Sequence, residues 1–276
     1  MAPDAHCAGC FGNREPVSSA GSSDRWLFRR AARPAPRLRL FCVPFAGCGA
    51  SAFNAWPSAF PESVELLAIQ LPGRESRYGT VALTDAHEAA RLLADAIEPY
   101  LDLDYAFFGY SMGALIAFEV IRELRRQGAP MPVQLFAAAR RAPQLAATRP
   151  PLAHLPREAC LRQLCDYYYE CPPPAWQNPE LLEIILPVLR ADMALCESYV
   201  YCHEPPFAFP IQAFAGQRDE SAPLSAVQAW RDQTTGAFDL EVFEGGHFFI
   251  NSSLSRLQHD LISRLGALMR EQCSRS

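Results

Sequence analysis

The sequence predicts an α/β fold in which helices cover both faces of a mostly parallel central sheet. Short apolar segments of strand length alternate along the chain with amphipathic segments of helical period. The chain has 276 residues, 50% of them hydrophobic, which suits one large core. A Gly-x-Ser-x-Gly sequence at 109–113 also connects one of these strands to the next helix. We therefore expect one domain over 25–276, preceded by a flexible tail at 1–24.

The first part of the chain is expected to alternate between strands and helices. Mostly apolar runs at 38–43 and 64–71 predict strands, because they are of strand length and too short to show a helical periodicity. Apolar residues at helical spacing predict a helix that begins at Ser51 and a second one over 84–101, with Thr84 as its N-cap.

The Gly-Tyr-Ser-Met-Gly sequence at 109–113 connects a predicted strand at 104–109 to a predicted helix at 112–127. In a sharp turn of this kind the serine hydroxyl projects from the edge of the sheet. Glycines on either side remove side chains that would clash where strand and helix approach. This is the nucleophile elbow of the α/β-hydrolase fold, with Ser111 as the nucleophile. The alternative is an ordinary glycine-containing turn in which Ser111 is only a helix N-cap.

The second part of the chain continues the pattern after an interruption. Further strands are predicted at 133–139, 211–215 and 240–243, and helices at 223–230 and 254–269. Between them, residues from about 142 to 208 contain proline-rich loops and two helical segments, at 156–169 and at 180–201, where Pro187 interrupts the second. We expect this insertion to form a helical lid over the sheet.

A serine hydroxyl needs a base within hydrogen-bond reach and a third group that orients the base. In the α/β-hydrolase fold the chain order is serine, acid, histidine. His247 follows the last predicted strand, and the two glycines before it let the backbone bend toward Ser111. Simple packing beside two phenylalanines is the alternative role for His247, and His203 is the best rival as the base.

The acid of this constellation is expected directly after the strand at 211–215. Asp219 lies there, in Gly-Gln-Arg-Asp, before the next helix begins. A turn aspartate is common, so a local role is the alternative, and Glu220 and Asp239 are rival acids. An oxyanion hole needs two backbone N–H groups, which we expect from Met112, after the nucleophile, and from Ala46, in the loop after the first strand.

Composition argues against several other classes of protein. The net charge is −5 and no long basic run occurs, which disfavours nucleic-acid binding. The sequence contains no stretch of 18 apolar residues, so we expect no transmembrane helix. The 10 cysteines, without a secretory signal, favour free thiols and a cytoplasmic location. We expect no metal or organic cofactor, not even at Cys7 and Cys10 in the tail, and we expect a monomer because no exposed apolar heptads occur.

An ordered set of motifs resembles one particular family. The set comprises Pro44-Phe-Ala-Gly47, Gln70-Leu-Pro-Gly-Arg74, Phe108-Gly-Tyr-Ser-Met-Gly113, Gly216-Gln-Arg-Asp219 and Gly246-His-Phe-Phe249. Together they are similar to the type II thioesterases of polyketide and nonribosomal peptide biosynthesis, over about residues 25–269. Tyr110 and Cys48 depart from the family pattern, which usually has histidine and often glycine there, but neither is one of the three expected catalytic positions.

The resemblance implies an editing hydrolase. Such enzymes cleave aberrant or stalled acyl groups from the phosphopantetheine arm of acyl or peptidyl carrier proteins, and the lid would shape the acyl pocket. Three alternatives remain open: a small-molecule carboxylesterase of the same fold, an acyltransferase, and a catalytically silent binding protein.

Side chains around the expected pocket have two possible roles. Aromatic residues of the lid either line an acyl channel or simply pack; they are Tyr167, Tyr168, Tyr169, Trp176 and Tyr199. Arginines in loops near the active face either steer an acidic carrier protein or form solvated charges and internal ion pairs, which we favour; they are Arg74, Arg77, Arg140, Arg141 and Arg149.

Overall fold

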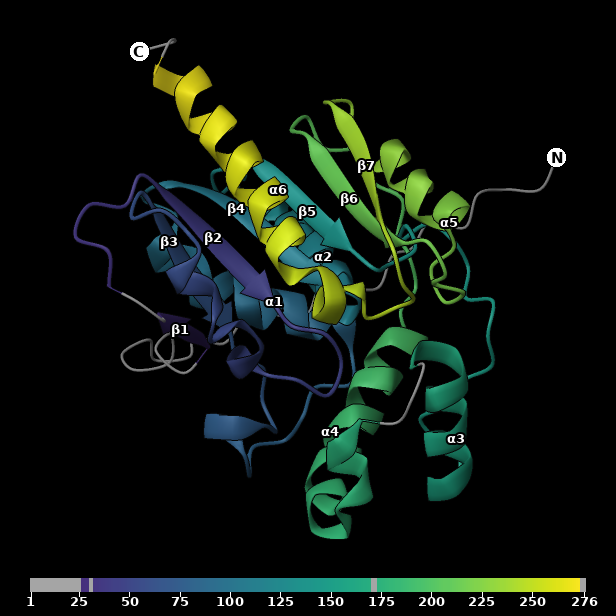
Figure 1. Cartoon of the computed structure of the whole chain (residues 1–276). Helices are drawn as coiled ribbons and strands as arrows, with labels where there is room; N and C mark the ends of the chain where they lie inside the picture. Colours follow the sequence, from purple (N-terminus) through teal and green to yellow (C-terminus); the bar gives the residue numbers. More distant parts are fainter. Residues whose placement is uncertain (1–25, 30–31, 170–172, 274–276) are drawn as a thin grey trace, which may run out of the picture.

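A computed structural model of the chain describes residues 26–29, 32–169 and 173–273 (Figure 1). Its seven-stranded sheet has the order β1-β3-β2-β4-β5-β6-β7. Neighbouring strands are parallel except at one edge, where β1 runs antiparallel to β3. The mostly parallel sheet is therefore as predicted, while the predicted tail at 1–24 lies outside the described residues.

The strands lie close to the apolar runs that predict them. They are β1 (Leu27–Arg29), β2 (Leu38–Val43), β3 (Val64–Ile69), β4 (Asp104–Tyr110), β5 (Gln134–Ala138), β6 (Ile211–Gly216) and β7 (Phe238–Phe243). Every residue of β2, β3 and β5 is buried, because helices cover both faces of a parallel sheet. The sequence did not predict β1, which has three residues and so carries too little pattern to detect.

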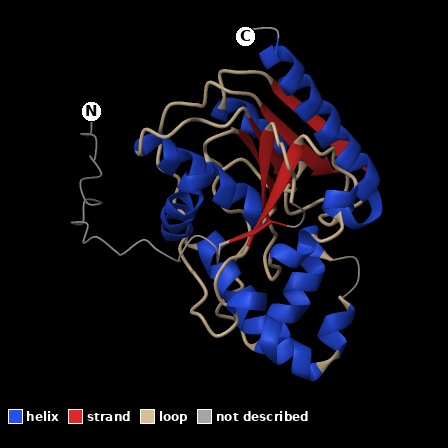
Figure 2. Ribbon diagram, turned by 90° about the vertical axis from the view of Figure 1, so that its left-hand side faces the viewer, coloured by secondary structure: helices blue, strands red, loops and turns tan. Residues whose placement is uncertain are grey.

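Helices form a layer on each side of this sheet (Figure 2). One layer holds α1 (Ala86–Ile97), α2 (Met112–Arg126) and α5 (Leu224–Gln228), and the other holds α6 (Phe249–Cys273). Side chains such as Ile121 of α2 belong to the same core cluster as Phe41 of β2. Leu261 of α6 belongs to the cluster on the opposite face, with Leu40. Alternate residues of β2 thus supply both cores.

Local details differ from the prediction in three places. Instead of one helix from Ser51, the chain forms short 3-10 turns at Ala50–Phe53 and Trp56–Ser58, where the rings of Phe53 and Trp56 pack 5.0 Å apart. Asp85, not Thr84, caps α1, because its carboxylate accepts the Glu88 N–H at 2.8 Å. The last helix begins at Phe249, five residues before the predicted start at 254, and it bends at Ser253.

Two helices separate β5 from β6, where the sequence predicts an insertion. They are α3 (Arg157–Tyr168) and α4 (Pro179–Glu197), and they lie side by side outside the two helical layers (Figures 1 and 2). Leu164 and Leu189 belong to a small apolar cluster of their own. Pro187 does not end α4, which continues through it for ten further residues to Glu197. The pair faces the carboxyl ends of the strands, next to the site described below.

Candidate active site

Ser111 occupies the turn between β4 and α2 with a left-handed backbone (φ 54°), which only a constrained turn imposes on a serine. Its N–H donates to the Ala138 carbonyl of β5 at 2.8 Å. A Cβ added at Gly113 would lie 2.2 Å from the Val43 carbonyl oxygen, and one at Gly109 would lie 2.4 Å from that of Gly113. The turn can therefore form only with glycine at both positions.

His247 and Asp219 extend from this serine in a continuous hydrogen-bonded array. The His247 Nε2 lies 3.0 Å from the Ser111 Oγ, and its Nδ1 lies 2.8 Å from the Asp219 Oδ2. His247 and Asp219 are only 5% and 4% exposed. With a proton on Nδ1 held by Asp219, Nε2 is free to accept the serine proton. The three residues predicted from the sequence thus come together in the geometry of a nucleophile, base and orienting acid.

Ser221 also belongs to this array, although the sequence reasoning missed it. Its hydroxyl donates to the Asp219 Oδ1 at 2.6 Å and lies 2.9 Å from the His247 Nδ1. The Ser221 N–H donates to the same Asp219 oxygen at 2.9 Å, and so does the Ala222 N–H at 3.1 Å. The Asp-x-Ser spacing that allows such a turn is visible in the sequence, but it is too common to indicate a site.

These contacts set the charge of Asp219. Burial by itself would raise the pKa of the Asp219 carboxyl, but the hydrogen bond and charge of His247 outweigh it. Bonds from Ser221 and the Ala222 N–H act in the same direction, so the net pKa lies below its usual value. Asp219 is therefore an anion at neutral pH and can stabilise an imidazolium at His247.

Tyr110 and Cys48, the two departures from the family pattern, both have defined surroundings. The Tyr110 hydroxyl donates to the His247 carbonyl at 2.6 Å and is fully buried. Cys48 lies in the loop after β2, and burial, with the charge of Glu75, raises the pKa of its thiol to about 12. Cys48 is therefore protonated at neutral pH and does not compete with Ser111 as a nucleophile.

The two expected oxyanion donors lie beside the serine. Ala46 and Met112 line the same cavity as Ser111 and His247. Met112 is the first residue of α2, so its N–H has no acceptor within the helix and points to the helix N-terminus. The backbone at Ala46 belongs to the loop that crosses the carboxyl end of β2. Their placement suits a pair of donors, and their role remains a prediction.

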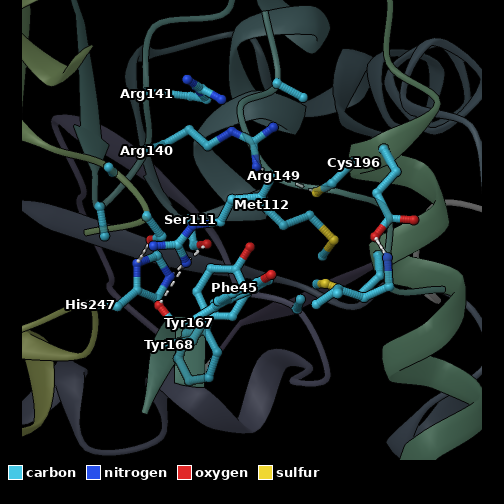
Figure 3. A pocket seen from close by; sticks show the side chains of 18 of the residues that line it. Phe45, Ser111, Met112, Arg140, Arg141, Arg149, Tyr167, Tyr168, Cys196 and His247 are labelled. Carbon is cyan, nitrogen blue, oxygen red and sulfur yellow. Dashed lines mark hydrogen bonds between the residues drawn. The ribbon is translucent and has the colours of Figure 1, made fainter. Parts of the chain in front are cut away.

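A cavity of about 120 Å³ opens above Ser111 (Figure 3). The sheet side contributes Phe45, Arg140 and Arg141, and the region of α3 and α4 contributes the three consecutive tyrosines 167–169 together with Leu189, Met193 and Cys196. The Tyr168 ring packs against the His247 ring at 4.9 Å. A second cavity of about 380 Å³ shares Phe45, Ala46, Tyr169, Leu189 and Phe248 with the first and is also lined by Trp176. The two cavities therefore adjoin at Ala46.

Several residues considered from the sequence lie elsewhere. His203 is exposed after α4 and does not line the cavity, and the Glu220 side chain is 87% exposed. Asp239 is exposed at the amino end of β7, whereas His247 follows its carboxyl end. Tyr199 donates to Glu119 at 2.7 Å instead of lining the cavity. Arg74 is 5% exposed and paired with Asp192, so it is one of the internal ion pairs that we favoured.

Two kinds of feature are absent from residues 26–29, 32–169 and 173–273. In these ranges no three or more His, Cys, Asp or Glu side chains are grouped to hold a metal ion. Nor does any helix in them combine the length and the apolar composition that crossing a bilayer requires. Cys7 and Cys10 lie outside the described residues.

Comparison with known proteins identifies the family. A model of the thioesterase domain family matches residues 38–267. The gramicidin S biosynthesis protein GrsT of Aneurinibacillus migulanus is 40% identical over 83% of this chain and 90% of its own length. Thioesterase PikA5 of Streptomyces venezuelae is 36% identical over 88% of this chain and 86% of its own.

Solved structures agree with the sequence relatives. RedJ, a thioesterase from the prodiginine pathway of Streptomyces coelicolor, superposes with a TM-score of 0.78 at 38% identity, over 86% of this chain and 92% of its own. YbtT, a type II thioesterase from the yersiniabactin pathway, superposes with a TM-score of 0.76 at 29% identity, over 88% of this chain and 99% of its own. The resemblance found in the sequence is confirmed: this chain belongs to the thioesterase family, has the α/β-hydrolase fold, and is a thioester hydrolase.

Proposed function

We propose that this chain is an editing thioesterase that hydrolyses aberrant or stalled acyl groups from the phosphopantetheine arm of carrier proteins in polyketide or nonribosomal peptide biosynthesis. The observation that carries the proposal is the Ser111–His247–Asp219 array at the base of a small cavity roofed by the lid region. The relatives support the pathway, because they include a gramicidin S biosynthesis protein and a type II thioesterase of the yersiniabactin pathway.

Ser111, His247 and Asp219 are the proposed catalytic residues. The Ser111 Oγ attacks the acyl carbon while the His247 Nε2 takes its proton, and the N–H groups of Ala46 and Met112 hold the oxyanion that forms. The tetrahedral intermediate then collapses, the C–S bond breaks, and the pantetheine sulfur leaves with the proton from His247. Asp219 stabilises the imidazolium between these steps.

The second half of the reaction uses the same residues. Water attacks the acyl-Ser111 ester as the His247 Nε2 takes one of its protons, and an oxyanion forms again in the same place. When this intermediate collapses, the Ser111 Oγ leaves and regains its proton from His247. The products are the free acid and the intact serine, so the chain's own residues account for every proton.

The two adjoining cavities fit the two parts of such a substrate. We place a short acyl group in the cavity of about 120 Å³ above Ser111. The pantetheine arm would enter through the neighbouring cavity of about 380 Å³, lined by Trp176 and Pro173. In this arrangement α3 and α4 act as the lid that the sequence predicts.

The proposal includes a cytoplasmic monomer that meets its carrier protein in solution. Six cysteines are free thiols, which suits a reducing compartment: Cys42, Cys48, Cys160, Cys165, Cys196 and Cys202. Arg140, Arg141 and Arg149 line the cavity above Ser111, where their charge could attract an acidic carrier.

The test compares two substrates with the wild type and the Ser111→Ala variant. One is a propionyl group on a phosphopantetheinylated carrier protein, and the other is a p-nitrophenyl ester. The proposal predicts a much higher kcat/KM on the carrier, and a loss on the order of 10⁴-fold or more in the variant. Rapid cleavage of the free ester with no action on the carrier would instead indicate a small-molecule carboxylesterase.

A further inference from the structure

A buried carboxylate on α4 holds the loop that carries one proposed oxyanion donor. We call residues 44–49 the oxyanion loop. The Asp192 Oδ2 accepts the Gly47 N–H at 2.7 Å, one residue beyond Ala46. Asp192 is fully buried, although it extends from the lid helix α4 and not from the sheet.

Arg74 completes this arrangement from a third part of the chain, the turn after β3. Its guanidinium donates two hydrogen bonds to the Asp192 carboxylate, from Nη1 to Oδ2 at 2.6 Å and from Nη2 to Oδ1 at 2.7 Å. The same Nη1 donates to the Cys48 carbonyl in the oxyanion loop at 3.1 Å. Asp192 and Arg74 together therefore bind the Gly47 N–H and the Cys48 carbonyl, which lie on either side of the Gly47–Cys48 peptide.

The turn that holds Arg74 is itself braced against the end of the oxyanion loop. Gln70 donates to the Arg74 carbonyl at 3.1 Å, and its Oε1 accepts the Ala50 N–H at 2.9 Å. Leu189, one turn before Asp192 on α4, packs in the same cluster as Ala46. The oxyanion loop is thus held by the turn after β3 on one side and by α4 on the other.

This arrangement has two consequences for the proposed reaction. Fixing the peptide groups around Gly47 also fixes the direction of the Ala46 N–H, which has to point at the developing oxyanion. In addition, Arg74 neutralises a carboxylate that would otherwise repel that oxyanion within a poorly solvated site. Simple stability is a weaker explanation, because a buried ion pair is often no more stabilising than apolar residues of similar size.

We propose that Asp192 and Arg74 are positioning residues for catalysis, which lock the oxyanion loop to the lid helix α4. The inference rests on the proposed function of Ala46 as an oxyanion donor. It follows that the oxyanion hole is complete only when α4 is seated, because moving α4 away would break the bond from Gly47 and both contacts to Arg74.

The test replaces both charged residues together, as Arg74→Met with Asp192→Leu, so that no charge is left buried without a partner. Glu183→Gln is the matched control, since Glu183 also lies on α4 and pairs with Arg157 of α3, away from the cavity. For each variant, kcat, KM, melting temperature and inhibition by a trifluoromethyl ketone analogue are measured. The ketone binds as an oxyanion-bearing adduct of Ser111 and so reports on the oxyanion hole.

A positioning role predicts that the folded double variant loses about 100-fold in kcat, with KM within about threefold of the wild type. The ketone should bind less tightly by a similar factor, and the control should match the wild type. A folded double variant with wild-type kcat and ketone affinity would overturn the inference. Rates are compared on whichever acyl substrate the wild type cleaves fastest, so that inactivity on the carrier counts against the proposed function alone.

Hydrogen exchange of the wild-type amides provides a measurement that does not depend on the variants folding. The Gly47 amide should exchange slowly because Asp192 holds it, whereas Gly79, in an exposed turn, should exchange fast. Equal rates at Gly47 and Gly79 would show that Asp192 does not hold the oxyanion loop in solution, and the inference would be abandoned.

Discussion

Tyr110 connects the nucleophile elbow to the loop that carries the proposed base. It lies directly before Ser111, and its hydroxyl donates to the backbone carbonyl of His247 itself. The Ile250 N–H approaches the same hydroxyl at 3.4 Å, and the ring stacks near Phe248. The Tyr110 side chain thus connects the backbone at His247 to the turn that holds Ser111. Related enzymes usually have a histidine at the position of Tyr110.

Tyr110→Phe tests this connection. The substitution keeps the ring but leaves the His247 carbonyl without its donor, so we expect kcat to fall about tenfold with KM nearly unchanged. Tyr105→Phe is the control, because Tyr105 also donates from a buried ring to a backbone carbonyl, that of Pro130, far from the site. It should lose a similar amount of stability and keep its kcat. Equal kcat losses in both variants would contradict a positioning role for Tyr110.

Residues of the site differ in how far the sequence could predict them. Ser111, Asp219 and His247 each follow a recognisable strand in the order that the fold requires, so the sequence locates them. Asp192 could not be found in that way, since it contacts a residue 145 positions away and sits in an otherwise ordinary amphipathic helix. Such long-range contacts follow from how α4 packs against the rest of the molecule, which local pattern does not specify.

The elbow depends on how closely β4, α2 and the end of β2 approach one another. Gly113 lies in the first turn of α2, directly against the backbone of β2. Its conformation is helical, so glycine is needed there for space and not for an unusual φ.

Gly113→Ala should therefore lower the free energy of unfolding by roughly 3 kcal/mol or more, because the Val43 carbonyl cannot move aside. Gly128→Ala separates this effect from backbone strain. Gly128 has φ 71° and open space around it, so alanine there should cost only about 1 kcal/mol. Urea denaturation of both variants checks the difference, and equal losses would contradict the close-approach argument.

Elements of regular structure were predictable where burial dictates their composition. The inner strands are apolar on both faces, and so the sequence locates them within two residues. Pro187 is the opposite case: the sequence predicts an interruption, yet α4 runs through it because packing of its other residues outweighs one missing hydrogen bond. The short 3-10 turns after the oxyanion loop likewise follow from packing of Phe53 and Trp56, which local period does not reveal.

At the scale of the whole molecule, a charged network binds the segment between α4 and β6 to α2. Glu204 lies in this segment and pairs with Arg122, Arg125 and Arg126 of α2. Partial burial would raise the pKa of Glu204, but hydrogen bonds from Arg125 and Arg122 lower it to about 2. Glu204 thus stays ionised in the folded protein at pH values where it is protonated in the unfolded chain.

This shift predicts how stability depends on pH. Because the folded pKa of Glu204 lies below the unfolded value, its contribution is present above about pH 4.5 and is lost as the pH falls toward 2. Between pH 6 and pH 3 the wild type should therefore lose about 1–2 kcal/mol more of its free energy of unfolding than Glu204→Gln. Urea titrations at both pH values measure this, with Glu183→Gln behaving as the wild type. Parallel losses in the wild type and Glu204→Gln would contradict the prediction.

In the proposed reaction, Ser111, activated by His247, removes an acyl group from a carrier protein. Intact-protein mass spectrometry of a propionyl-phosphopantetheinyl carrier protein, incubated with wild type or with Ser111→Ala, tests this most directly. We expect the wild type to convert the acylated carrier to its free-thiol form, with the pantetheine arm retained, and Ser111→Ala to leave it acylated. Equal deacylation by both proteins, or an acylated carrier that the wild type leaves intact, would contradict it.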